Sequence, residues 1–122
     1  MQNLKLCESE YRFMQIVWDE APVSSGRLAA LCLQRLGWKK STTYTVLKKL
    51  CGRGFVQNEQ AIVTPLVKRD DVQSYESEVF VERTFSGSLP AFIAAFVRGR
   101  KLDEEEAEEI KRMIDESRKE TQ

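Results

Sequence analysis

The residues from 39 to 53 combine hydroxyl and cationic side chains in a spacing that suits contact with a polyanion. At about 100° per residue of an α-helix, Thr42, Thr45 and Lys49 lie on one side, and an apolar set around Leu47 and Leu50 lies on the other. Hydroxyl and cationic side chains bond phosphates and base edges, and threonine methyls contact thymine methyls. The stretch predicts a DNA-recognition helix over about residues 41–53, with solvated surface charge as the alternative. The candidate contact residues are Lys39, Lys40, Ser41, Thr42, Thr45, Lys48, Lys49 and Arg53.

Catalytic chemistry finds little support in the sequence. The chain has no histidine, and no nucleophile-elbow, dinucleotide-binding or phosphate-loop motif occurs. The carboxylates from Glu104 to Glu109 cluster at a surface helix end and not in a buried site of the kind that acid–base catalysis uses. Three widely spaced cysteines without histidine match neither a disulfide framework nor a zinc or redox motif. We therefore expect neither an enzyme nor a cofactor or metal site.

The net charge of zero conceals two halves of opposite sign. Residues 1–69 contain eleven Lys and Arg against five Asp and Glu, a net +6, and residues 70–122 contain eight against fourteen, a net −6. Cations gain by releasing counterions from a phosphate backbone, whereas carboxylates are repelled by it. The split favours a polyanion-binding module followed by a protein-binding module, although chance clustering of solvated charge remains an alternative.

The elements that would position the recognition helix follow from apolar spacing and caps. Helices are predicted from about Ser9 to Asp19, and over about eleven residues between a Ser24 or Ser25 cap and Gly37. The third helix is predicted to be capped by its Ser/Thr cluster. The β-formers at 55–56 and 62–67 flank a polar turn and predict a hairpin. This order is that of a winged helix-turn-helix over residues 1–69.

Residues 70–122 predict helices only, so the expected fold class is mainly α with a small β-hairpin wing. One helix follows Asp70, a second follows a Ser88 cap, and a third begins at Asp103 with Glu106 completing a capping box. Their apolar stripes exceed what a short helical appendage buries within itself, which predicts a homodimerisation domain. The candidate interface residues are Leu89, Phe92, Ile93, Phe96, Val97, Ile110, Met113 and Ile114.

Three segments carry a resemblance to a known family: CESEYRFMQIVWDEAPVSSGRLAALCLQ, TTYTVLKKLCGRGFV and TPLVKRDD. They resemble successive signatures of the penicillinase-repressor family, and the likeness covers almost the whole chain. It implies a homodimeric winged-helix repressor of a palindromic operator, often controlling β-lactam resistance genes, whose repression ends when a membrane sensor-protease triggers its cleavage. It also implies that Thr42 and Thr45 are the recognition-helix threonines and Lys49 the basic residue one turn later.

Three features depart from the family pattern. The predicted wing has Glu59 and no Lys or Arg; Ala95 and Phe96 stand where β-lactam-responsive members have a cleaved Asn-Phe; and no cysteine follows Cys51, which argues against copper sensing. The start of the chain lacks a signal-peptide pattern and no apolar run reaches a membrane-spanning length, so we expect a cytoplasmic protein without direct membrane binding. The rival interpretation is a winged-helix module that binds protein rather than a specific DNA sequence.

Overall fold

A computed structural model describes residues 3–120. The chain divides into two compact units, Met1–Val79 and Phe80–Gln122. The division lies inside helix α4 (Arg69–Phe85), whereas the sequence suggested a division between residues 69 and 70. The first half of α4 thus belongs to the first unit.

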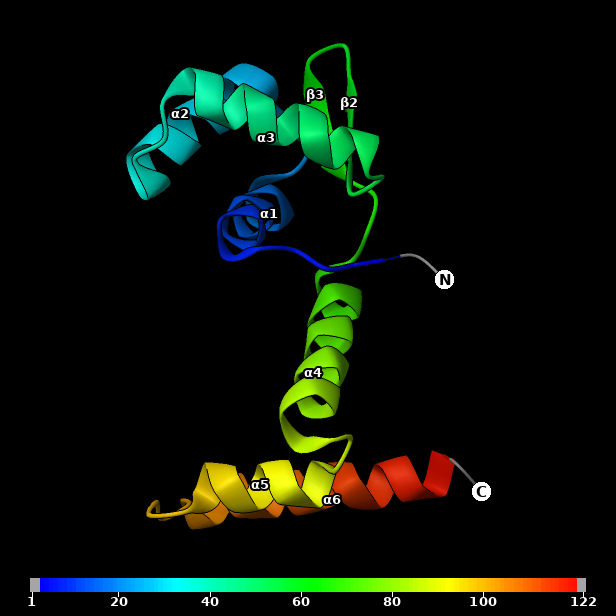
Figure 1. Cartoon of the computed structure of the whole chain (residues 1–122). Helices are drawn as coiled ribbons and strands as arrows, with labels where there is room; N and C mark the ends of the chain where they lie inside the picture. The colour runs from blue at the N-terminus through cyan, green and yellow to red at the C-terminus, as the bar shows by residue number, and fades with distance from the viewer. Residues whose placement is uncertain (1–2, 121–122) are drawn as a thin grey trace. The chain divides into compact units, whose positions relative to one another are not determined.

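The first unit begins with three helices, α1 (Glu8–Glu20), α2 (Ser25–Leu36) and α3 (Lys40–Gly52) (Figure 1). The predicted caps of α2 are confirmed: the Ser24 hydroxyl accepts from the Arg27 N–H at 3.0 Å, and Gly37 ends the helix at φ +70°. The cap predicted for α3 is wrong. Lys39 is its N-cap residue without a side-chain cap, so the Ser/Thr cluster lies inside the first turn.

A small antiparallel sheet completes the helical unit. Strands β2 (Val56–Glu59) and β3 (Ile62–Pro65) form the predicted hairpin, and the two turn residues Gln60 and Ala61 have φ values of 51° and 63°. Positive φ at both positions is the backbone conformation that lets a two-residue turn match the twist of the flanking strands. The sequence did not reveal β1 (Val23–Ser24), which pairs with β3 and gives the strand order β1-β3-β2.

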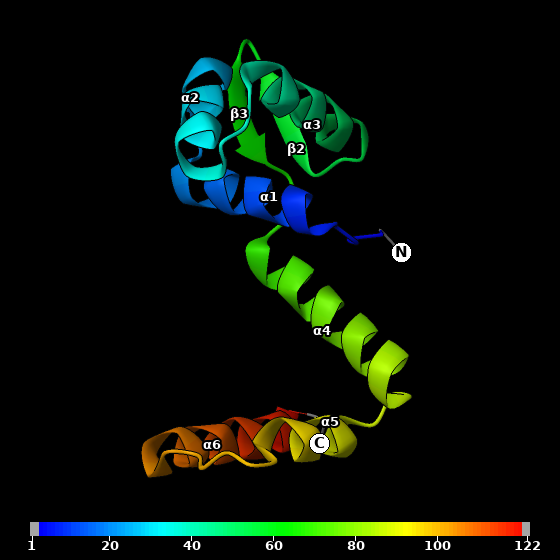
Figure 2. The same ribbon diagram turned by 60° about the vertical axis from the view of Figure 1, so that its left-hand side comes forward.

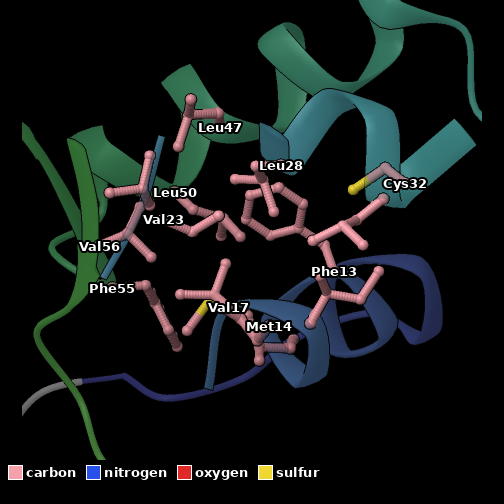
Figure 3. Close-up of a cluster of buried hydrophobic side chains, with 14 of the residues drawn as sticks. Phe13, Met14, Val17, Val23, Leu28, Cys32, Leu47, Leu50, Phe55 and Val56 are labelled. Carbon is pink, nitrogen blue, oxygen red and sulfur yellow. The ribbon is translucent and has the colours of Figure 1, made fainter. Parts of the chain in front are cut away.

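The core of the first unit lies between α1, α2, α3 and the sheet (Figures 2 and 3). Every helix contributes its predicted apolar stripe, and the Phe13 ring stacks on Trp38 with centroids 6.2 Å apart. Burial of each large side chain contributes about 1.5–3 kcal/mol. Its largest fully buried apolar residues are Phe13, Phe55, Met14, Leu28, Leu31, Leu50, Val17, Val56, Val63 and Val72.

The N-terminal half of α4 packs against this core. Val72 is fully buried, the Tyr75 hydroxyl donates to the Asn3 side-chain oxygen at 3.2 Å, and the Gln73 amide donates to the Tyr11 hydroxyl at 3.2 Å. Near the start of α4, Arg69 pairs with Asp19 at 2.6 Å. These contacts explain why the division of the chain comes after the start of the helix.

The second unit contains the end of α4, α5 (Leu89–Val97) and α6 (Glu104–Glu120). Helices α5 and α6 lie side by side and run in opposite directions (Figures 1 and 2). The Ser88 hydroxyl accepts from the Ala91 N–H at 3.1 Å, as predicted. At the start of α6, the Asp103 side chain accepts a hydrogen bond from the Glu105 N–H at 2.8 Å. The predicted capping box would use the N–H of the next residue, Glu106.

Candidate nucleic-acid interface

Helix α3 presents two chemically different faces. Thr43, Leu47 and Leu50 are buried against the core, as the periodicity predicts. The opposite side of the helix is exposed and bears hydroxyl and cationic groups only. Its exposed side chains are Ser41, Thr42, Thr45, Lys48 and Lys49, and the exposed Lys39 and Lys40 adjoin them at the start of the helix.

The threonines of the exposed face differ in their hydrogen bonding. The Thr45 hydroxyl donates to the Ser41 carbonyl at 2.9 Å, so its hydrogen is committed within the helix. Towards a base, Thr45 therefore offers an oxygen that accepts from an amino group and a methyl that contacts thymine. Within the described residues the Thr42 hydroxyl has no such intrahelical bond, so it can donate or accept.

The N-terminus of α3 is suited to phosphate. Its first N–H groups point out of the helix with the positive end of the helix dipole, which favours an anion. Lys39 and Lys40 are exposed there, and the Lys40 ammonium also lies 5.9 Å from the centroid of the Tyr44 ring. These groups form a cationic edge beside the threonines.

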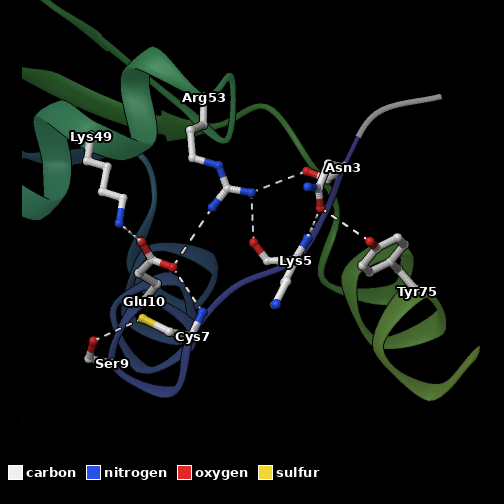
Figure 4. A network of polar contacts seen from close by, with 8 residues as sticks. All are labelled: Asn3, Lys5, Cys7, Ser9, Glu10, Lys49, Arg53 and Tyr75. Atoms are coloured by element: carbon white, nitrogen blue, oxygen red, sulfur yellow. Dashed lines mark hydrogen bonds and ion pairs between the residues drawn. The ribbon is translucent and has the colours of Figure 1, made fainter. Parts of the chain in front are cut away.

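Two of the predicted contact residues are already engaged inside the protein (Figure 4). The Lys49 ammonium lies 2.9 Å from one oxygen of Glu10, and the Arg53 guanidinium lies 3.9 Å from the other. Arg53 also donates to the backbone carbonyls of Lys5 at 2.7 Å and Asn3 at 3.3 Å. Arg53 therefore ties the end of α3 to the N-terminal segment, a role that the sequence analysis did not foresee.

Glu10 is the centre of this network. Its side chain is only 7% exposed, and one oxygen accepts from the Cys7 N–H at 2.9 Å. Burial alone would raise its pKa, but the Cys7 N–H, the Lys49 ammonium and the Cys7 thiol outweigh that cost and lower the pKa of Glu10 to about 2. The signal in the sequence was a carboxylate on the apolar face of α1, three residues before Phe13.

The wing is uncharged apart from one carboxylate. Residues 57–60 are polar, Glu59 is exposed, and no Lys or Arg lies in the hairpin. Ile62 points outward from β3 with 44% of its surface exposed. The hairpin thus lacks cations for phosphate, so the cations of the candidate site come from α3 and the residues at its start.

The candidate interface residues of the second unit divide into two sets. Phe92 packs in an aromatic cluster with Phe80, Phe85 and Phe96, and Val97 is half-buried. Phe80 and Phe85 were not among the predicted interface residues, since neither lies on the α5 stripe. The outer set remains exposed and comprises Leu89, Ile93, Ile110, Met113 and Ile114, together with Phe96, whose ring is exposed although it also contacts Phe92. A single chain therefore leaves a large apolar surface on this unit.

The described residues offer no metal site. Between residues 3 and 120 no three His, Cys, Asp or Glu side chains gather as a metal site. Burial raises the pKa of the Cys32 and Cys51 thiols, which keeps them in the unreactive protonated form. No helix in this part of the chain is long and apolar enough to cross a bilayer.

Comparison with known proteins gives the family. The sequence profile of the penicillinase repressor family matches residues 6–116. The chain belongs to the penicillinase repressor family. A penicillinase repressor of Bacillus licheniformis is 20% identical over 116 residues, which span 92% of this chain and 91% of that protein. Membership confirms the winged-helix fold class and identifies the chain as a transcriptional repressor rather than an enzyme.

Proposed function

We propose that this penicillinase-repressor family member binds a DNA operator with α3 in the major groove. The observation that carries the proposal is the exposed face of α3, where hydroxyls and cations stand opposite a fully buried apolar face. Thr42 and Thr45 read base edges, while Lys39, Lys40, Ser41 and Lys48 position the helix on phosphates. A repressor acts where the chromosome lies, so we also propose a cytoplasmic location.

Threonine variants test the assignment of base contacts. An operator is selected from a random DNA pool with the wild-type protein, and affinity is measured by fluorescence anisotropy. Thr45→Val keeps the methyl and removes the oxygen, whereas Thr45→Ser does the reverse, so each should lose a different part of the base preference. Loss of one good base contact costs about 1–3 kcal/mol. A Thr42→Ala, Thr45→Ala double variant that binds operator like the folded wild type would overturn the assignment.

Salt dependence separates DNA recognition from the rival protein-binding function. Binding through phosphates weakens with a log–log slope of about −0.9 for each phosphate neutralised. For the wild type we expect a slope that corresponds to several neutralised phosphates, and for Lys48→Gln a shallower slope. Salt-independent or absent DNA binding would favour a winged-helix module that holds protein through α3.

We further propose that the second unit forms a homodimer. No residue of α5 is buried within one chain, and both α5 and α6 expose large apolar side chains. The same surface of a second copy of the chain would cover them with apolar groups. Two linked reading heads gain affinity for a palindromic operator because the second head binds at high effective concentration. This gain compensates for the few base contacts that one head makes.

Analytical ultracentrifugation tests the dimer. The wild type should sediment at twice the mass of one chain at micromolar concentration, and Ile93→Glu should shift it towards one chain. Leu33→Glu is the matched control, because Leu33 is also apolar and exposed but lies on α2 in the first unit. A wild type that stays monomeric at all concentrations would refute the dimer.

Relief of repression by proteolysis is the last part of the proposal. A cut between Ala95 and Phe96 would divide α5 within the exposed stripe and leave the DNA-binding unit intact. Because this pair lacks the family's asparagine, the protease would need a different side-chain preference. A chain cut here through an engineered protease site should bind a full palindrome no better than a half-site, whereas unchanged palindrome affinity would exclude this mechanism. Control of antibiotic resistance genes remains a proposal that rests on the family alone.

A further inference from the structure

The ion pair between Glu10 and Lys49 lies at the border of the proposed DNA-binding face. Lys49 comes one turn after Thr45 on α3, and 63% of its side chain is exposed. The Glu10 carboxylate that pairs with it is almost completely buried, and its other oxygen accepts a hydrogen bond from the Cys7 N–H. Lys49 thus carries a charge at the surface whose counterion belongs to the protein itself.

An ammonium that already has a carboxylate partner gains little from phosphate. A free lysine that binds a DNA phosphate releases one condensed counterion, which is the main source of sequence-independent affinity. At 2.9 Å from Nζ, the Glu10 oxygen cancels most of the field that a phosphate would experience. A phosphate that approached Lys49 would also be repelled by Glu10.

The second cation of the network, Arg53, does not take the place of Lys49 as a partner for DNA. Arg53 is committed to the carbonyls of Asn3 and Lys5, and its guanidinium lies 4.6 Å from the centroid of the Phe55 ring. It is farther from the carboxylate, at 3.9 Å, than Lys49 is. Arg53 is thus held by backbone carbonyls, while Lys49 is the cation whose surface charge is cancelled by Glu10.

We infer that Glu10 limits the sequence-independent DNA affinity of this repressor by cancelling the charge of Lys49. This inference rests on the proposed function of α3. Lys49 then positions α3 against α1 instead of contacting phosphate, and base contacts by the neighbouring threonines supply a larger share of the total affinity. Glu10 is a specificity-determining residue although it touches no DNA.

Three variants of the full-length protein test the inference on a fluorescent duplex of mixed sequence without operator. Glu10→Gln removes the charge but keeps an oxygen that can accept from the Cys7 N–H. Lys49→Gln removes the cancelled cation, and the double variant removes both. Lys48→Gln is the matched control, because Lys48 is the preceding residue, is exposed, and takes part in no ion pair within the described residues.

The expected results concern the salt slope of binding. Glu10→Gln should steepen the log–log slope by about 0.9 and raise the affinity roughly eightfold at 0.1 M salt, as one added phosphate contact does. Lys49→Gln leaves the Glu10 charge without its partner, so its slope should be shallower than that of the wild type, whereas the double variant removes both charges and should return to the wild-type slope. Lys48→Gln should make the slope shallower by about 0.9, and this loss should be the same in the wild-type and Glu10→Gln backgrounds.

Two outcomes would overturn the inference alone: an unchanged slope for folded Glu10→Gln, or a double variant whose slope is shallower than that of the wild type. If Glu10→Gln alone does not fold, the double variant, which removes the ion pair as a whole, still decides between these alternatives. Failure of the proposed function has a different signature, in which the wild type binds the duplex without salt dependence and Lys48→Gln changes nothing. That result would remove the inference together with the function.

Discussion

Acidification should destabilise the first unit through Glu10. The network lowers the pKa of this carboxyl from its ordinary value of 4.5 to about 2 in the folded protein. A carboxyl with a lowered folded-state pKa contributes stability that is fully present above the unfolded pKa and is lost as the pH falls through the folded pKa. The contribution should therefore be complete above about pH 5 and disappear between about pH 4.5 and pH 2.

The magnitude follows from the size of the pKa change. A fall from 4.5 to about 2 corresponds to about 3 kcal/mol of unfolding free energy, at about 1.36 kcal/mol for each pH step. The Glu10 side chain is 7% exposed, but 63% of the Lys49 side chain is exposed, so solvent screening of this ion pair makes the figure an upper value. This is a large share of the stability of a small domain.

Urea denaturation followed by tryptophan fluorescence provides the assay. Both tryptophans, Trp18 and Trp38, lie in the first unit, so the signal reports this unit alone. Glu10→Gln does not titrate, and the stability difference between it and the wild type should shrink as the pH falls from about 6 towards about 2. Lys49→Gln should move the loss to higher pH, because the Glu10 pKa rises without the ammonium. A wild-type advantage that stays constant down to about pH 2 would refute the reasoning.

Three further substitutions test the core of the first unit and the C-terminal end of α2. Phe13→Ala should cost about 3–5 kcal/mol in urea denaturation, because a fully buried ring that stacks on Trp38 is lost; a cost below about 1 kcal/mol would contradict the core assignment. Thr43→Val should raise stability by about 1 kcal/mol, since the buried hydroxyl lies beside Cys32 without a hydrogen bond of standard geometry; a loss of stability would indicate a hidden partner. Gly37→Ala should lower the thermal midpoint through a cost of about 1 kcal/mol, because φ is +70° there; an unchanged midpoint would show that the helix end rearranges.

Features that depend on neighbours in sequence could be predicted. The Ser24 and Ser88 side chains bond to N–H groups three residues further along the chain, and Gly37 ends α2 through its own backbone conformation. The buried face of α3 follows from helical periodicity alone. The exposed threonine face of the candidate site comes from the same periodicity. These parts need no knowledge of which elements meet.

Features that join distant segments could not be predicted in this way. Strand β1 has two residues and exists because β3 pairs with it. The partner of Lys49 is a glutamate on another helix, and helical periodicity says only that Lys49 is exposed. The cap of α3 was assigned to its Ser/Thr cluster because these residues usually cap, but the chain enters the helix earlier, at Lys39.

The hydrogen bond at the wing tip restricts how the sequence can vary in length. Hairpin tips usually accept inserted residues because nothing holds them. Here the Ser25 N–H, at the start of α2, donates to the Ala61 carbonyl in the turn at 2.8 Å. One added residue would break this bond and turn the buried Val63 of β3 outward. Homologous repressors that keep the bond should therefore have wings of equal length.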